Sequence, residues 1–246
     1  MTYCVAVRVT AGIVLLSDTR TNAGMDNVSR FTKMYSFAVP GERVIAMLTS
    51  GNLSLTQSVI SNLRRAIARA EETGSGEETI LNADTMFRVA QLVGREMRKM
   101  QAEHRDSIIA QSAMADASIL LAGQRKGGVH RLYLIYSAGN FIEATRDTPF
   151  FQIGEHKYGK PILDRVITPE STIDEAMKAV CVSMDSTIRS NLSVGMPLDL
   201  AVIPKDVLGF SVQRRIEADD PRFAAISHSW GKALRNGFAD LPDFMD

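Results

Sequence analysis

The order of the hydrophobic repeats is the feature that most restricts how this 246-residue chain can fold. Segments in which every second residue is apolar predict strands, and segments with apolar residues three or four positions apart predict helices. The repeats follow the order strands, two helices, strands, one helix, strands, one helix. Such alternating runs favour antiparallel sheets covered by helices over the strict strand–helix alternation of a doubly wound fold.

The predicted strands are short apolar segments bounded by turn residues. They are residues 4–9, 12–17, 34–39, 43–48, 117–123, 131–137, 141–145, 150–154, 199–203 and 209–215. Turns such as Pro40–Glu42 join neighbouring strands and predict hairpins. The first fifty residues therefore predict an antiparallel β unit.

Four predicted helices each carry one apolar stripe. Residues 54–70 and 83–100 form the first two, with the acidic segment 71–78 between them as a surface loop. Thr172 with Glu175 predicts a capping box at the start of the third. The stripes consist of Leu55, Val59, Leu63, Ile67 and Ala70; Met86, Val89, Val93, Met97 and Met100; Met177, Val180, Met184, Ile188 and Leu192; and Phe223, Ile226, Trp230 and Leu234. Two face-to-face sheets with helices on both outer faces would bury all four stripes, so we predict an α+β fold, a four-layer αββα sandwich of two antiparallel sheets.

Composition excludes several classes of protein. The 28 basic residues balance the 28 acidic residues, which argues against a general nucleic-acid binder. Cys4 and Cys181 are too few for a disulfide framework and are expected to be buried thiols in a reducing cytosol. Neither a secretory leader nor an apolar run of the ~20 residues that cross a bilayer is recognisable. We expect a soluble, cytoplasmic protein with no membrane partner.

Most catalytic motifs are missing from the sequence. The four histidines, His104, His130, His156 and His228, are scattered, and none lies in an HExxH pattern. There is no GxSxG elbow, no phosphate-binding GxxxxGK[ST] and no GxGxxG after a strand. We therefore expect no metal and no cofactor.

Polar residues at the strand ends of the N-terminal sheet are the remaining candidates for chemistry. Thr2 and Asp18 lie at the same end of the first predicted hairpin, Lys33 begins the third strand, and Gly51 follows another strand. By pattern alone they are also typical of a frayed terminus, a turn, a surface charge and a loop.

The chemistry of a terminal threonine gives this group a catalytic interpretation. A hydroxyl needs a base to take its proton, and a terminal amine can serve, since its ordinary pKa is about 7.7–8.0. Lys33 would lower that pKa and keep the amine neutral, and Asp18 would hold Lys33. The Gly51 N–H would face the developing oxyanion. This requires removal of Met1, which we expect because Thr2 is small.

The same residues resemble a known family. Thr2, the segment SDTRT with Asp18 and Arg20, KMYSF from Lys33 and the TSGN turn at Gly51 resemble proteasome β-subunits, which are N-terminal-nucleophile hydrolases. The similarity is collinear over residues 2–205. The segment GEHKYGKPILDR and the lack of a propeptide are most similar to the bacterial ancestral β-subunit branch.

The resemblance implies a fold and roles for individual residues. It implies the αββα sandwich, with Thr2 as nucleophile and its own amine as base. It further implies that Lys33 tunes that base, that Asp18 pairs with Lys33, and that Gly51 donates to the oxyanion. Arg20 would be a supporting residue.

Three positions depart from the family pattern. Glu155 follows Gly154 where the family has a serine, Asn191 stands where it has a supporting aspartate, and Val194 where it has a supporting serine. Ser193 can substitute for that serine, and Glu155 can supply the missing carboxylate. Supporting changes at other sites commonly cost 10–100-fold in activity, so a slow or selective enzyme is expected.

The resemblance also suggests function and organisation. Residues 1–246 would be one proteasome-type β-subunit domain with a C-terminal extension from about residue 206, either an extra capping helix or an assembly element. Its last residues place Phe238, Leu241 and Phe244 among acidic residues. The leading hypothesis is a threonine peptidase that cleaves peptides or unfolded proteins inside a homo-oligomeric ring or open spiral.

Two alternatives remain. The same residues suit an N-terminal-nucleophile amidase acting on a small molecule or on crosslinked peptides. Alternatively, the chain is a weakly active or non-catalytic assembly subunit, which Asn191 and Val194 favour and which an intact Thr2, Asp18 and Lys33 disfavour. An ATP-dependent unfoldase partner is not identifiable from the sequence.

Overall fold

The computed structural model describes residues 2–22, 28–110 and 116–244. Within these residues the strands form two five-stranded antiparallel sheets and a two-stranded ribbon. The first sheet has the order β10-β1-β2-β11-β12, with β1 (Tyr3–Val9), β2 (Gly12–Asp18), β10 (Phe150–Gly154), β11 (Leu198–Pro204) and β12 (Val212–Ile216). The second has the order β5-β6-β7-β8-β9, with β5 (Met34–Val39), β6 (Arg43–Gly51), β7 (Ala117–Arg125), β8 (Arg131–Ile135) and β9 (Phe141–Glu143). The ribbon pairs β3 (Arg20–Asn22) with β4 (Val28–Arg30).

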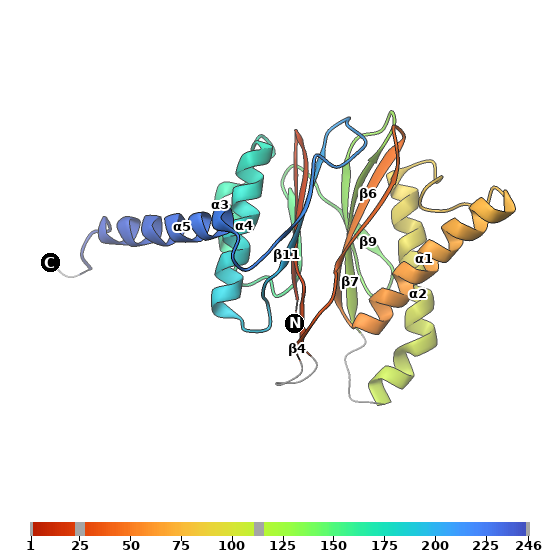
Figure 1. Cartoon of the computed structure of the whole chain (residues 1–246), viewed down its shortest axis with the longest axis horizontal. Helices are drawn as coiled ribbons and strands as arrows, with labels where there is room; N and C mark the ends of the chain where they lie inside the picture. Colours follow the sequence, from red (N-terminus) through yellow and green to blue (C-terminus); the bar gives the residue numbers. More distant parts are fainter. Residues whose placement is uncertain (1, 23–27, 111–115, 245–246) are drawn as a thin grey trace.

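Helices cover the outer face of each sheet (Figure 1). The second sheet is covered by α1 (Leu53–Thr73) and α2 (Met86–Ala110), and the first by α3 (Lys160–Val166) and α4 (Ile173–Ser190). The last helix, α5 (Pro221–Ala239), extends away from the layers (Figure 1). This arrangement confirms the predicted four-layer αββα sandwich.

The first strand shows why the strands of these sheets are apolar at nearly every position in the sequence. Val5 and Val7 pack toward α4, whereas Cys4 and Ala6 pack toward the second sheet, and all four are fully buried. A sheet between a helix layer and another sheet must be apolar on both faces. Both cysteines, each in the described part of the chain, are buried free thiols, as expected.

The helix stripes are buried as predicted in α2 but only in part in α4. All five residues of the α2 stripe are buried. The capping box of α4 is present, with the Thr172 hydroxyl accepting from the Glu175 N–H and the Glu175 carboxylate accepting from the Thr172 N–H. Leu192, however, was wrongly assigned to the buried stripe. The helix ends at Ser190, and Leu192 is 89% exposed in the loop that follows.

The last helix also departs from its prediction. Its Asp220 N-cap and first-turn proline are as expected. No residue of α5, all of which is described, is buried, and Leu234 is 53% exposed. Phe223 and Ile226 in its first turns pack against the body, and the half-buried Trp230 lines a cavity with residues of α3 and α4. The expected burial of the whole stripe was wrong because the helix continues past the surface of α4 (Figure 1).

Smaller differences have local causes. The predicted strand 209–215 is β12, which starts later because positive φ at Asp206 and Leu208 makes a turn before it. The short helix α3 was missed, although Pro161 in its first turn is a typical helix start.

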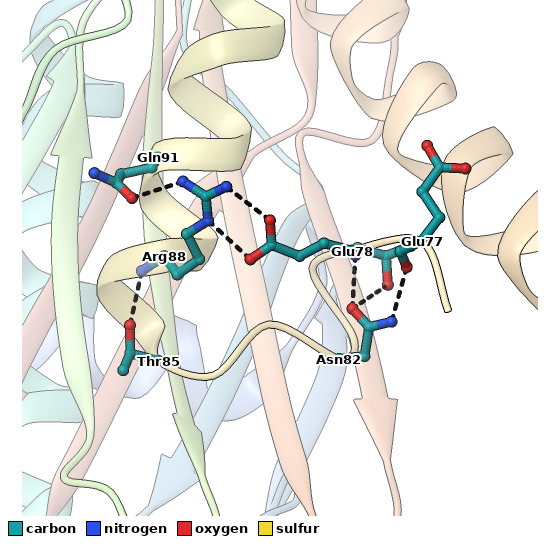
Figure 2. Close-up of polar contacts among 7 residues, drawn as sticks. Glu77, Glu78, Asn82, Thr85, Arg88 and Gln91 are labelled. Carbon is teal, nitrogen blue, oxygen red and sulfur yellow. Dashed lines mark hydrogen bonds and ion pairs between the residues drawn. The ribbon is translucent and has the colours of Figure 1, made fainter. Parts of the chain in front are cut away.

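The connection between α1 and α2 is a surface segment held to both helices. The helix α1 continues through Thr73 and ends at Gly74, which has a left-handed φ of 58°. Figure 2 shows the Arg88 guanidinium of α2 donating to both oxygens of Glu78, at 2.8 and 2.7 Å. Arg69 of α1 forms the same bidentate ion pair with Glu77. Exposed ion pairs therefore hold the predicted loop against both helices.

Among the residues that the structure describes, none of the helices has the length and apolar character needed to span a membrane.

A buried histidine joins the two sheets at the end of β1. His130 Nε2 lies 2.9 Å from the Val9 carbonyl oxygen, and its Nδ1 has no hydrogen-bond partner among the described residues. Since the carbonyl only accepts, Nε2 carries the proton of this hydrogen bond. Burial lowers the pKa of His130, as do the charges of Arg8 and Lys205, whereas the bond to Val9 and the charge of Asp206 raise it.

This arrangement predicts an acid-sensitive sheet contact. The pKa of His130 is lower in the folded protein than in the unfolded chain, so the unfolded chain binds a proton more tightly. The free energy of unfolding therefore falls as the pH drops below the unfolded pKa of about 6.5. Urea unfolding at pH 7.5 and 5.5 checks this. His130→Gln keeps a donor for Val9 and should lose less stability between these pH values than the wild type. An equal loss in both proteins would contradict the prediction.

Candidate active site

Thr2 lies directly before β1 and is fixed through its backbone. Its carbonyl oxygen accepts a hydrogen bond of 2.7 Å from the Glu155 N–H, and the next residue, Tyr3, pairs with Gly154 of β10. The β1–β10 pairing therefore fixes where residue 2 lies. Met1 is outside the described residues.

A buried ion pair lies beside Thr2. Lys33 Nζ is 2.7 Å from Asp18 Oδ1, and the side chains of Lys33 and Asp18 are 4% and 0% exposed. The Tyr3 N–H donates to the same carboxylate oxygen at 3.0 Å, and Lys33 also donates to the Arg20 carbonyl at 2.5 Å. Asp18 thus connects the lysine ammonium to the backbone of the residue after Thr2.

The protonation of Asp18 depends on these contacts. Burial raises the pKa of Asp18, because a charged carboxylate loses its water. The Lys33 ammonium opposes this, as do hydrogen bonds from the Tyr3 and Gly195 backbones. A carboxylate that accepts from an ammonium at 2.7 Å is held in its charged form, and it keeps that ammonium in place.

Arg20 connects this pair to the loop after α4. Its guanidinium donates to the Leu192 carbonyl at 2.8 Å. It also packs on Gly195 so closely that a Cβ at residue 195 would lie 2.4 Å from the guanidinium carbon. A larger side chain at residue 195 would displace the guanidinium from this position, and Arg20 lies at the edge of the site.

Gly51 ends β6 in a conformation that only glycine adopts comfortably. Its φ is 98°, and a Cβ there would lie 2.2 Å from the Asp116 carbonyl oxygen. The preceding Ser50 reaches toward the start of β1, because a Cβ on Gly154 would lie 1.9 Å from the Thr2 oxygen and 3.2 Å from Ser50 Oγ. Gly51 therefore directly follows Ser50, whose side chain lies near Thr2.

The residues that depart from the family pattern also meet here. The Asn191 amide donates to the Glu155 carboxylate at 3.0 Å, and the Ser193 N–H donates to the Asn191 side-chain oxygen at 2.9 Å. Glu155 is only 8% exposed and follows the glycine that contacts Thr2. Val194 is fully buried among apolar residues of the first sheet and α4. A carboxylate–amide pair thus borders the site.

The fold therefore brings the candidates from the sequence into one region. Thr2, Asp18, Lys33 and Gly51 come from the ends of neighbouring strands. The sequence did not predict the contacts of Tyr3 and Gly195 with Asp18, because both are made by backbone N–H groups that carry no residue signature. A hydroxyl residue next to a buried ion pair provides residue types that nucleophilic catalysis uses.

Comparison with known proteins identifies the family. The family model described as "Proteasome subunit" matches residues 2–203. This chain belongs to the proteasome subunit family. No curated protein matches the sequence significantly.

Solved proteasome-family structures resemble the chain over its whole length. Anbu, an ancestral β-subunit, from Yersinia bercovieri is 45% identical, with a TM-score of 0.90, and the match covers 99% of this chain and 100% of that one. The Anbu Gly-1 mutant from Hyphomicrobium sp. strain MC1 is 43% identical, with a TM-score of 0.90 and all of both chains covered. A structure of the helical assembly of the Anbu complex from Pseudomonas aeruginosa is 43% identical, with a TM-score of 0.89 over 98% of this chain and 97% of that one. These matches confirm the resemblance to the ancestral β-subunit branch.

Proposed function

We propose that this chain is a threonine-type peptidase with Thr2 as nucleophile, once Met1 is removed. The buried Lys33–Asp18 pair carries the proposal, because it is joined through the Tyr3 N–H to the residue that follows Thr2. A buried ammonium at that position depresses the pKa of a nearby amine and keeps it neutral near pH 7. A buried ion pair alone adds little stability, which makes a catalytic use the better account of it.

The reaction follows from these positions. The Thr2 hydroxyl adds to the peptide carbonyl carbon while its proton passes to the Thr2 amine. The oxyanion is stabilised by the Gly51 N–H. The amine then returns the proton to the leaving amine, the C–N bond breaks, and an ester to Thr2 remains. Water hydrolyses that ester by the same two proton transfers, regenerating the hydroxyl.

Glu155 is proposed to supply the carboxylate that Asn191 lacks. Its carboxylate is nearly buried, accepts from Asn191, and follows the glycine that contacts Thr2. Glu155→Gln keeps the size of the side chain and removes its charge. We expect the pH dependence of Thr2 reactivity to shift to lower pH, because a nearby negative charge raises the pKa of an amine. An unchanged pH profile would exclude this role.

Intact mass measured before and after incubation with a peptide epoxyketone tests the proposal. That reagent forms a stable ring only with a free terminal amine and its hydroxyl. A chain that lacks Met1 and gains the inhibitor mass supports a working Thr2. A processed chain that remains unmodified by a panel of such peptides, and that cleaves neither peptides nor small amides, supports the assembly subunit instead. Cleavage of small amides alone supports the amidase.

The second part of the proposal is self-assembly of this cytoplasmic chain through its extension. We propose that residues 1–246 form one proteasome-type domain with a C-terminal extension from about residue 206, and that the last helix of this extension, α5, docks on a second copy. The apolar stripe of α5 continues beyond the body through Leu234 and Phe238 to Leu241, which are 53%, 77% and 62% exposed. A related Anbu forms a helical assembly, so a second copy is the occupant we propose for this face.

Charge substitution on α5 is expected to reduce the assembly. Phe238→Glu with Leu241→Glu places two carboxylates on the exposed stripe and should lower the mass measured by light scattering. Leu192→Glu, at an 89% exposed site outside α5, is the control and should leave the mass unchanged. An assembly that survives the α5 change would show that another surface joins the copies.

A further inference from the structure

The loop that carries Glu155 is bounded by two glycines, and each contacts the start of β1. At one end, a Cβ on Gly154 would lie 1.9 Å from the Thr2 carbonyl oxygen. At the other end, a Cβ on Gly159 would lie 2.6 Å from the Tyr3 hydroxyl and 2.2 Å from Ser183 Oγ. Residues 2 and 3 therefore support both ends of the loop, and no larger side chain fits at either glycine.

The Tyr3 hydroxyl is the polar centre of the second contact. It lies 2.6 Å from Ser183 Oγ of α4 and accepts from Gln152 Nε2 of β10 at 2.6 Å. The Tyr3 side chain is fully buried among apolar residues. Burial raises the pKa of the Tyr3 phenol far above its ordinary value, so the phenol keeps its proton and can donate it to Ser183.

Tyr3 also contacts the charged pair from its other end. Its backbone N–H donates to Asp18 Oδ1, the oxygen that receives Lys33 Nζ. One rigid residue thus links the Asp18–Lys33 pair, β10, α4 and the end of the Glu155 loop. It is bonded directly to Thr2. A buried phenol needs hydrogen-bond partners, and here they come from two separate elements, β10 and α4.

We propose that the Tyr3 phenol is a positioning group for Thr2. Its hydrogen bonds to Gln152 and Ser183 fix the first residue of β1. The Thr2 amine is thereby held at a fixed position relative to Asp18, Lys33 and Glu155. This inference rests on the proposed function, since it concerns how Thr2 is made reactive. Tyr3 itself touches no reacting atom.

Tyr3→Phe tests the proposal, because it removes one oxygen and keeps the ring. We expect the rate of Thr2 modification by the epoxyketone to fall about 10–100-fold, the range found when supporting hydrogen bonds around other sites are removed. We also expect the midpoint of its pH profile to rise, because a looser start of β1 places the Thr2 amine farther from the Lys33 ammonium. Intact mass confirms that Met1 is absent in each variant.

Tyr133→Phe is the matched control. Tyr133 is also buried, at 1% exposed, and its ring packs edge-on against Phe141 of the second sheet. It packs against α1 and α2 rather than near Thr2. Tyr133→Phe should lower the melting temperature about as much as Tyr3→Phe does. It should leave the rate of Thr2 modification within about twofold of the wild-type rate and the midpoint of the pH profile unchanged. If both variants slow the reaction equally without moving the midpoint, the effect is general loosening and the proposal fails.

Ser183→Ala removes the α4 partner of the Tyr3 hydroxyl. It provides a second test if Tyr3→Phe does not fold. It should slow modification less than Tyr3→Phe and move the pH midpoint in the same direction. Wild-type rate and midpoint in a folded Ser183→Ala and Tyr3→Phe would overturn the positioning role while leaving the proposed function intact. A wild-type protein that is never modified would instead remove the proposed function on which the inference rests.

Discussion

Replacing Thr2 with alanine is expected to abolish epoxyketone modification and peptide cleavage while leaving the fold unchanged. The loss should be at least about a thousandfold, since removing a nucleophile elsewhere costs up to about a millionfold. The fold should persist because the contacts that place residue 2 are made by its backbone, through the bond from the Glu155 N–H. Reaction rates, melting temperature and particle mass, measured on the same preparation, check this.

Thr2→Ser is the control for that experiment. It keeps the hydroxyl and the terminal amine and loses only a methyl group, so modification should remain measurable. Retained cleavage in Thr2→Ala, with Met1 absent, would exclude Thr2 as the nucleophile. Cleavage lost equally in Thr2→Ser would indicate that the methyl group is needed to orient the hydroxyl.

Lys33→Met is expected to cause the second large effect, on both reactivity and stability. The Lys33 ammonium is proposed to lower the pKa of the Thr2 amine, so modification at pH 7 should fall sharply. Asp18 would be left buried without its counter-ion, and breaking such pairs typically costs about 3–5 kcal/mol in the free energy of unfolding. Urea unfolding measures the second effect.

The pH dependence of that variant gives the sign of the effect. Burial already raises the pKa of Asp18, and removing Lys33 removes the main opposing influence. The folded protein then binds a proton more tightly than the unfolded chain, so the free energy of unfolding increases as pH falls. Lys33→Met should therefore recover stability between pH 7.5 and 5.

A double variant separates charge from packing. Asp18→Asn with Lys33→Met removes both charges and should be more stable than Lys33→Met at pH 7.5, with little of its pH dependence. It should remain unreactive. A double variant that is no more stable than Lys33→Met would mean that lost packing, and not the buried charge, causes the instability.

The sequence predicted the layers well because each layer imposes its own repeat. The strands of the first sheet are apolar on both faces, as a sheet between helices and another sheet requires, and the α2 methionines recur at helical spacing. Strand ends were also informative, because hairpin geometry places Thr2 and Asp18 at one end of a sheet. The roles proposed for these residues come from the resemblance to the family.

Contacts between distant segments could not be predicted in the same way. Tyr3 and Ser183 are 180 positions apart, and nothing in either neighbourhood of the sequence indicates the other. The pairing of Asn191 with Glu155 has the same character. For α5, the apolar stripe indicated that some surface covers it, but periodicity cannot say whether that surface belongs to the same chain. Leu234 was assigned to the core for that reason.

The direction in which α5 leaves the body has a geometric consequence for any polymer of this chain. A helix of 19 residues is about 28 Å long at 1.5 Å per residue, so it can reach well beyond the layers that bear the site. If it binds a different face of the next copy, each copy is related to the next by the same rotation and translation. Such a contact closes into a ring only when the translation is zero and the rotation divides a full turn; otherwise it continues as a helix. A small change in the angle between α5 and α4 would then decide whether the sites face a closed chamber or line an open groove.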